Sequence, residues 1–571
     1  MIGEILGVIL IFLITVILAY PLGKYMASVF RGEKTITDFM KPLERFIFRI
    51  SGIKPGEGMN WKQFLKAMLT VNLLWLVYAM FMLIYQDKLP LNPDGNACQT
   101  PDLAFNTAIS FLVNCNLQHY SGESGLTYLT QLLVVTFLQF LSAATGIACL
   151  VALFNGLKEK TTNNLGNFWN YLVLSTTRIL LPLSFIVAVI LAFNGTPTSY
   201  DGKDSIVTLQ GDSVQVSRGP AAGMIAIKQI GTNGGGWFGA NSAHPLENPN
   251  YFTNAIETIS ILLVAVALVF SLRFYINRKK LAWMIFGVMT FLCVIFISIN
   301  TYYETRGNPA IDKMGIAQHL GSMEGKEIRI GSAATALWSV VTTSTSNGSV
   351  NGMHDSLTPV SGGVVILDMM INALYGGVGV GLLNFFIFII IAVFISGLMV
   401  GRTPEFMGHK VEAREVKIAV LITLLSAFLI KGFTALAAYF VTYHPGIAWA
   451  VKPSAWLNNP SYHGFSEMLY EYTSANANNG SGFEGLGDNN VFWNVTTGIV
   501  LLLGRYLPII GPVAIIGLLA NKKFIPESPG TLRTDSMTFG VMILTVIIIV
   551  TALSYLPPLA LGPLAEYFSL Y

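Results

Sequence analysis

Four short polar stretches, each between two hydrophobic segments, hold the residue types in this sequence that are best suited to bind an ion. They are rich in Gly, Asn, Ser or Thr, and glycine costs about 1 kcal/mol relative to Ala inside a helix, so they are not expected to be helical. Glycine tolerates positive φ and leaves neighbouring carbonyl groups uncovered. Backbone oxygens that converge on one axis can replace the water shell of a small cation. The stretches are Val113, Asn114, Cys115 and Asn116; Gly231, Thr232, Asn233 and Gly234; Thr345, Ser346, Asn347 and Gly348; and Ala477, Asn478, Asn479 and Gly480.

Four such loops in one chain predict a pseudo-fourfold pore lined by main-chain carbonyls. The alternative is four flexible loops of the kind common in transporters. Asn116 stands where the other stretches have Gly234, Gly348 and Gly480, so the first quadrant is expected to differ in geometry. Gln118 follows the first stretch and is expected either to shape the filter mouth or to be a surface amide.

The composition places these loops in a polytopic membrane protein. The chain has 571 residues, of which 53% are hydrophobic and 11% charged, whereas soluble domains usually carry about 25% charged residues. The basic residues are confined to particular loops, so the net charge of +3 does not indicate nucleic acid. The four cysteines have no metal-ligand spacing and do not predict a disulfide framework.

Ten segments approach the length of about 20 apolar residues that a bilayer core requires. The first follows no basic region and precedes no clear cleavage site, so it is expected to be a spanning helix. The segments are 2–20, 64–85, 126–155, 172–193, 253–275, 281–300, 371–400, 416–442, 491–519 and 536–556.

The connections between these segments alternate in kind. The odd-numbered ones are basic, as in the fifth with Arg273, Arg278, Lys279 and Lys280, and the even-numbered ones are long and rich in Gly, Asn and Ser. The positive-inside bias therefore predicts that the basic loops are cytoplasmic, that both termini are outside, and that the polar stretches enter from outside.

The expected fold is all-α, with one helix, four helix–pore-loop–helix units and one final helix. A half-helix is expected before each polar stretch, at 103–112, 221–230, 333–343 and 464–473, and the partly negative C-terminal end of such a helix favours cations. Alternation around a Gly-Asp pair predicts an exposed hairpin at 205–217. The expected divisions are 1–63, 64–155, 172–275, 281–400, 416–519 and 536–571.

Two further features predict a barrier beneath the pore. Arg505 lies midway along a spanning segment, where a charge is costly and usually faces a cavity or the bundle interior. It is expected to hinder leak of cations, and the alternative is a partner for a buried carboxylate or for carbonyls. Glycines such as Gly377 and Gly379 interrupt the seventh segment and would permit a break, with close helix packing as the alternative.

Other polar residues are less informative. Lys431 lies within the eighth segment and is expected to snorkel, to meet another subunit or to face the pore. Asp368 precedes the seventh segment and would attract cations or cap that helix. His244, His354 and Glu247 lack helical ligand spacing and are interpreted as structural residues.

Residues 231–249, with the sequence GTNGGGWFGANSAHPLENP, resemble the signature of the KdpA family, the potassium-binding and translocating subunits of Kdp-type ATPases. The resemblance extends to QHYSGE at 118–123, VNGMHDS at 350–356 and GRTPE at 401–405, and with ten helices it covers essentially the whole chain.

The resemblance implies a transporter fold with four non-identical pore-loop repeats, in a bacterial or archaeal plasma membrane. It implies K⁺ as the transported ion, held by the filter carbonyls, and no covalently bound cofactor. The implied partners are a P-type ATPase catalytic subunit that uses ATP, a single-span accessory subunit, a small membrane peptide subunit and membrane lipid, with no nucleic acid. In the family the seventh helix is broken, which favours a gate at Gly377 and Gly379.

The sequence has no Walker-type Gly-x-x-x-x-Gly-Lys-Ser/Thr and no Asp-Lys-Thr-Gly, so this chain is not expected to hydrolyse ATP alone. The expected function is that of the potassium-selective subunit of an ATP-driven uptake complex. One alternative is a passive or ion-coupled potassium transporter of the Trk/Ktr type. A second is a membrane scaffold that binds no ion.

Overall fold

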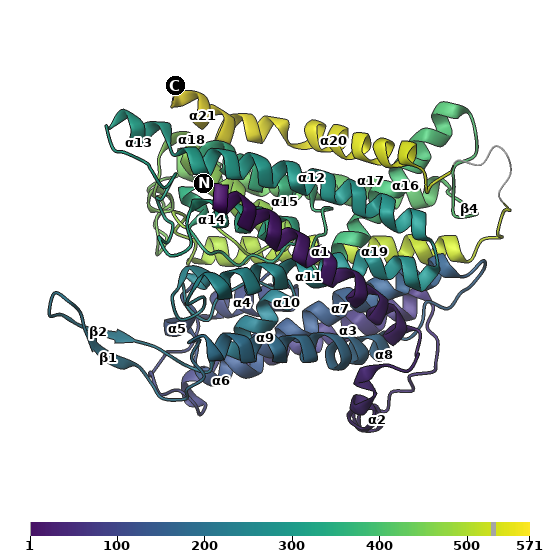
Figure 1. Ribbon diagram of the computed structural model, residues 1–571, viewed down its shortest axis with the longest axis horizontal. Helices are drawn as coiled ribbons and strands as arrows, with labels where there is room; N and C mark the ends of the chain where they lie inside the picture. Colours follow the sequence, from purple (N-terminus) through teal and green to yellow (C-terminus); the bar gives the residue numbers. More distant parts are fainter. Residues whose placement is uncertain (1, 527–532, 571) are drawn as a thin grey trace.

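The computed structural model describes residues 2–526 and 533–570 as a bundle of long helices (Figure 1). Residues 1 and 571, which belong to the first and last expected divisions, lie outside the described residues. The two ends of the chain lie at one end of the bundle, together with the hairpin of β1 and β2, whereas α2 and β4 lie at the opposite end (Figure 1).

Ten helices in the described residues are long and apolar enough to cross a membrane, as the sequence predicts. Three of them contain a π-helical turn, at Gln131–Thr136, Ser175–Leu180 and Ala560–Leu564. The ten are α1 Ile2–Phe30, α3 Trp61–Ile84, α6 Tyr128–Thr130 with α7 Phe137–Lys158, α8 Phe168–Leu174 with α9 Leu181–Phe193, α11 Tyr251–Ile276, α12 Lys279–Arg306, α16 Val380–Val400, α17 Ala413–Tyr443, α19 Val491–Ala520, and α20 Met537–Leu559 with α21 Ala565–Ser569.

Four shorter helices form the descending half of each repeated unit, as expected. Each ends at one of the polar stretches, because two positions in every stretch have a left-handed backbone that cannot continue an α-helix. The four are α4 Pro101–Leu112, α10 Ala221–Ile230, α14 Ser332–Ser344 and α18 Ser461–Ala477. With the spanning helices on either side they make four helix–pore-loop–helix units, and α1 and α20 are the additional helices.

The expected seventh segment, 371–400, is wrong at its start. Residue 371 ends a separate helix, α15 Pro359–Ile371, and α16 begins only at Val380. The backbone between them has positive φ at Asn372, Tyr375, Gly376 and Gly379, which excludes a continuous α-helix. The glycines therefore form a non-helical loop, 372–379, between two helices.

The bounds of the first helix also differ from expectation. Helix α1 continues through Pro21 to Phe30 instead of ending at residue 20. A proline is tolerated in a helix of this kind where neighbouring helices support the freed backbone, and α1 packs along α11.

Burial separates central helices from peripheral ones. In its most apolar window α7 is 89% buried, and the corresponding window of α1 is 22% buried. The exposed side chains of α1 include Leu6, Leu10 and Ile17, which suit contact with lipid or another subunit. The helices that follow the polar stretches, α7, α11, α16 and α19, are 67–89% buried in these windows and form the centre of the bundle.

The remaining elements are short. Strands β1 Asp204–Val207 and β2 Ser213–Val216 form an antiparallel hairpin in which Asp204 is opposite Val216, as the alternation predicts. A second hairpin joins β3 Glu405–Phe406 and β4 His409–Lys410. The short helices are α2 Lys41–Ile50, α5 Gly122–Gly125 and α13 Pro309–Lys313.

Candidate functional site

The four polar stretches meet in the interior of the bundle. In three of the four seams, the fourth residue of one stretch lies against the carbonyl of the third residue of the next, so closely that a Cβ would overlap it. The pairs are Gly234 with Asn347, Gly348 with Asn479 and Gly480 with Cys115. The remaining seam is closed by Asn116, whose Nδ2 donates to the Gly234 carbonyl at 2.6 Å. The stretches therefore form a closed ring in chain order.

Each stretch is tied to its own half-helix by the same backbone hydrogen bond. The N–H of the third residue donates to the carbonyl five residues earlier, which lies in the last turn of the half-helix. The four bonds are Cys115 to Ser110 at 3.0 Å, Asn233 to Lys228 at 2.8 Å, Asn347 to Thr342 at 2.9 Å and Asn479 to Ser474 at 2.9 Å. Because the same bond occurs in all four units, the stretches share one local geometry. In each of them this N–H is directed to the half-helix.

The backbone alternates in handedness along every stretch. The second residues have φ between 46° and 64°, the fourth residues have φ between 59° and 102°, and the third residues are not left-handed. Successive residues of opposite handedness turn their like backbone groups to one side. Such an alternation directs consecutive carbonyls to the same side of the stretch, which is the arrangement needed to coordinate a cation.

Asn116 adopts the left-handed conformation of the glycines, with φ 59°. Asparagine is one of the few residues that tolerate this region. The backbone of the first stretch at this position therefore matches that of the other three, although its seam is closed by a side chain. The difference lies in side-chain bonding, because Asn114 Nδ2 donates to the carbonyls of Thr232 at 2.8 Å and Gly231 at 3.2 Å. A carbonyl has two lone pairs, so these oxygens keep one for another partner.

Asparagine side chains also brace the seams between units. Asn347 Nδ2 donates to the Lys228 carbonyl at 2.9 Å, and Asn479 Nδ2 donates to the Thr342 carbonyl at 2.8 Å. In both cases a residue of one stretch bonds the last turn of the preceding half-helix. These bonds hold the ring at a fixed diameter.

Gln118 lies at the edge of the ring. Its Oε1 accepts from the Gly236 N–H at 2.7 Å, and its Nε2 donates to the Gly236 carbonyl at 3.2 Å. The side chain thus joins the segments that follow the first and second stretches. It is partly buried and is not a free surface amide.

The loop 372–379 lies directly against the ends of two units. Gly376 N–H donates to the Ser344 carbonyl at 2.7 Å, and Val378 N–H donates to Thr232 Oγ1 at 2.9 Å. Arg505 lies beside this loop and is 3% exposed. Its Nη2 donates to the Ser142 carbonyl at 3.4 Å, and its guanidinium lies 3.3 Å from where a Cβ of Gly377 would be. No carboxylate of the described residues pairs with Arg505.

This geometry accompanies a whole-chain likeness to known proteins. The family model described as "Potassium-transporting ATPase A subunit" matches residues 9–568. The chain belongs to this family. A "Potassium-transporting ATPase potassium-binding subunit" of Flavobacterium johnsoniae is 62% identical over 99% of both chains. A protein of the same description from Geobacillus kaustophilus is 45% identical over 98% of both.

A solved structure shares the fold. The potassium transporter TrkH from Vibrio parahaemolyticus superposes with a TM-score of 0.51 at 15% identity, covering 78% of this chain and 84% of that one. At this identity the likeness concerns the fold alone. It agrees with four pore-loop units within one chain.

Two other residues of this A-subunit family member have well-defined positions. Asp368 lies inside α15 and accepts from Thr343 Oγ1 at 2.8 Å and Ser344 Oγ at 2.6 Å, through Oδ2. The suggestion that it caps α16 is wrong, since the residue before α16 is Gly379. Lys431 is exposed on α17, so it does not face the ring.

His244, His354 and Glu247 lie in different contacts. The ring of His244 stacks on Phe238 with centroids 4.1 Å apart, and His354 Nδ1 is 2.7 Å from the Tyr470 hydroxyl. Glu247 forms a fully buried ion pair with Lys228. Lys228 was not singled out from the sequence, although a lysine three residues before Gly231 in an apolar half-helix is a signal of a buried partner.

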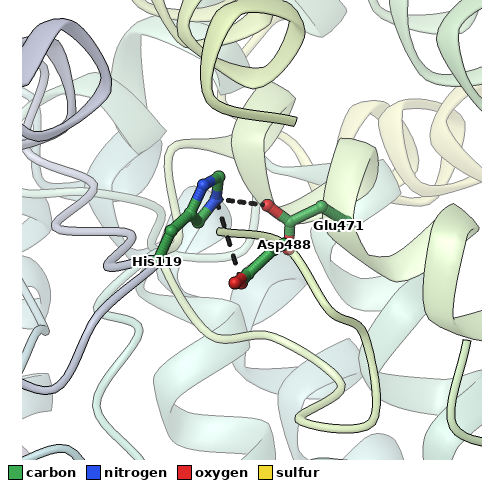
Figure 2. Close-up of side chains that lie close together, drawn as sticks. All are labelled: His119, Glu471 and Asp488. Carbon is green, nitrogen blue, oxygen red and sulfur yellow. Dashed lines mark hydrogen bonds and ion pairs between the residues drawn. The ribbon is translucent and has the colours of Figure 1, made fainter. Parts of the chain in front are cut away.

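A cluster of one histidine and two carboxylates, which was not predicted from the sequence, lies next to the ring of polar stretches. His119, one residue after Gln118, is within reach of Glu471 of α18 and Asp488 of the loop before α19 (Figure 2). Burial opposes the charge on His119, but Asp488 and Glu471 outweigh it and raise the pKa of His119 to about 9. The cluster connects the first unit to the fourth, beside the seam between Gly480 and Cys115.

Proposed function

We propose that this chain is the potassium-selective, ion-binding and translocating subunit of an ATP-driven uptake complex. The observation that carries the proposal is the closed ring of four stretches with alternating backbone handedness. We propose that K⁺ is held there by the main-chain carbonyls of residues 113–116, 231–234, 345–348 and 477–480. Gln118 shapes the mouth of this filter by fixing the segment at Gly236.

We further propose that Arg505 and the loop with Gly377 and Gly379 form the barrier beneath the filter. The loop is bonded to the ends of the second and third units through Thr232 and Ser344. A buried guanidinium with no carboxylate partner in the described residues would repel a cation that passed the filter. The ion would then leave sideways toward the ATPase subunit.

The relatives' description as subunits of a potassium-transporting ATPase supports a P-type ATPase catalytic subunit as the partner. We propose a single-span accessory subunit and a small membrane peptide subunit as further partners. We also propose a bacterial or archaeal plasma membrane with both termini outside. Helix α2, whose sequence includes Arg45 and Arg49, lies at the end of the bundle opposite the termini, which supports this orientation (Figure 1).

The test is binding of Rb⁺ and K⁺ to the full-length chain, purified with the subunits it assembles with, in the presence of competing Na⁺. We expect saturable binding that Na⁺ does not displace and that Gly234→Asp weakens at least tenfold. A Cβ on Gly234 would overlap the Asn347 carbonyl. The matched control is Gly223→Asp, because Gly223 is exposed on α10 with open space around it. Binding unchanged in Gly234→Asp would contradict the proposed filter.

One alternative is a passive or ion-coupled potassium transporter, because the fold shared with TrkH does not by itself distinguish a pump subunit from such a transporter. In that case, uptake into cells or vesicles would continue without ATP and without a second large membrane subunit. Strict dependence on both supports the pump. A chain that binds no ion under any condition would leave only a scaffold role.

A further inference from the structure

The cluster of His119, Glu471 and Asp488 has the features of a metal site that the proposed transport of K⁺ does not use. The three residues come from three segments: the loop after the first stretch, the half-helix α18 and the loop before α19. One ligand atom of each lies within 4.8 Å of the others. Figure 2 shows the imidazole and both carboxylates directed toward one another.

Two successive hydrogen bonds fix the tautomer of neutral His119, and so determine that the nitrogen facing the carboxylates carries the lone pair. Asn494 Nδ2 donates to Asp102 Oδ2 at 2.7 Å, so the amide oxygen of Asn494 is the atom turned toward His119. That oxygen accepts from His119 Nδ1–H at 2.6 Å. Neutral His119 therefore carries its lone pair on Nε2. Most metal-binding histidines donate such a hydrogen bond from the other ring nitrogen, which fixes the tautomer and the ring orientation.

Nε2 points at two anionic groups. It lies 3.2 Å from Glu471 Oε1 and 3.9 Å from Asp488 Oδ2. A lone pair that faces two carboxylates is stable only when a cation lies between them, and that cation is either a proton on Nε2 or a metal ion. The side chain of Asp488 makes no hydrogen bond to another described residue, and it is 28% exposed. It thus supplies both a free ligand and a route of entry.

We propose that His119, Glu471 and Asp488 bind a divalent transition-metal ion, with Zn²⁺ as the best match. One imidazole and two carboxylates are the donor types that Zn²⁺ accepts, with water completing four ligands. The two carboxylates balance the charge of the ion. Mg²⁺ and Ca²⁺ fit less well, because they prefer a set made only of oxygen. A bound metal would link the segment after the first stretch to the fourth unit.

A second cluster, around His463, has an arrangement in which protons on both ring nitrogens satisfy the neighbouring carboxylates. His463 has Asp355 Oδ1 at 2.9 Å from Nε2 and Glu566 Oε1 at 2.9 Å from Nδ1. Both ring nitrogens are occupied by carboxylates, so the ring forms two ion pairs and offers no free lone pair. His463 is therefore the matched control.

The test uses the full-length chain, purified with the subunits it assembles with and stripped with a chelator, and Zn²⁺ as the probe. We expect about one Zn²⁺ per chain by elemental analysis, and nitrogen and oxygen ligands by X-ray absorption. Zn²⁺ should also raise the midpoint of thermal unfolding, because it binds only the folded chain. His119→Gln and Asp488→Asn should each weaken binding at least tenfold, whereas His463→Gln should leave it unchanged.

Asn494→Ser changes a residue that is not a proposed ligand. Without the Asn494 oxygen, the tautomer of His119 is no longer fixed, and we expect the affinity for Zn²⁺ to fall about 10-fold to 100-fold. If His119→Gln does not fold, the variants of half-buried Asp488 and of Asn494, which is not a proposed ligand, still decide the outcome. Failure of the unmodified chain to bind Zn²⁺, equal binding by Asp488→Asn, or sulfur ligands from the exposed Cys98 would overturn the proposal. None of these readouts depends on potassium transport, so the metal site and the filter are tested separately.

Discussion

Gly348 lies against the main-chain carbonyl of Asn479, with no space for a side-chain carbon between them. The same relation joins the second stretch to the third and the fourth to the first. The ring is thus closed by backbone packed on backbone. Its diameter depends on the absence of side chains at three positions and on the amide of Asn116 at the fourth.

Gly348→Ala tests the packing of this seam. The substitution forces a Cβ onto the Asn479 carbonyl and places an alanine at φ 89°, where a non-glycine residue costs about 1–3 kcal/mol. We expect Rb⁺ affinity to fall at least tenfold and discrimination against Na⁺ to decrease, both measured by competition binding. Gly432→Ala is the control, because Gly432 on α17 has open space around it. Wild-type affinity in Gly348→Ala would contradict the role of the seam.

Asn116 separates the requirement for backbone shape from that for a hydrogen bond. Asn116→Gly keeps access to φ 59° but loses the 2.6 Å bond to the Gly234 carbonyl, worth about 0.5–1.5 kcal/mol. We expect a loss of about 2-fold to 10-fold in ion affinity. Asn116→Val adds a β-branched side chain that does not tolerate this conformation, so its loss should be larger. Equal effects of the two variants would show that the conformation is not required.

Much of this architecture could be predicted from the sequence. Hydrophobic length gave the ten spanning helices, and the residues after each half-helix identified the four stretches. These features depend on local composition. The break at 372–379 was only partly predictable, because the glycines indicated an interruption but not that α15 precedes it as a separate helix.

The contacts between units were not predictable. His119, Glu471 and Asp488 are far apart in the chain and meet only because the first and fourth units are neighbours in the ring. Lys228 and Glu247 pair through a loop whose path no local pattern specifies. The departure at Asn116 was visible in the sequence, but the local sequence did not show that its backbone would match the glycines and that its side chain would close the seam.

Arg505→Gln tests the barrier beneath the filter. At an effective dielectric constant of about 20, a unit charge repels K⁺ about 8 Å away by about 2 kcal/mol, a factor of roughly thirty in passage. We therefore expect passive Rb⁺ flux through proteoliposomes without ATP to rise about tenfold or more. Arg505→Lys retains the charge and should keep the flux low. A flux that is low in both variants would show that the charge is not the barrier.

The contacts of His463 with Asp355 and Glu566 should make the folding stability of the chain depend on pH. Burial alone would lower the pKa of this residue, but hydrogen bonds to Asp355 and Glu566 outweigh it and raise the pKa to about 10. Glu467 is a third carboxyl group near the His463 imidazole. Because the folded pKa is above the ordinary value of about 6.5, the stabilisation is fully present below pH 6.5 and is lost as the pH rises through 10.

Thermal unfolding of the full-length chain between pH 6 and 10 measures this loss. The midpoint of wild type should exceed that of His463→Gln at pH 6, and the difference should shrink toward pH 10 as the imidazolium loses its proton. His444→Gln is the control, because His444 is exposed and, among the described residues, its side chain hydrogen bonds only to the Tyr439 hydroxyl. A difference that stays constant from pH 6 to 10 would show that His463 stabilises the contact between α18 and α21 by packing, without the ion pairs to Asp355 and Glu566.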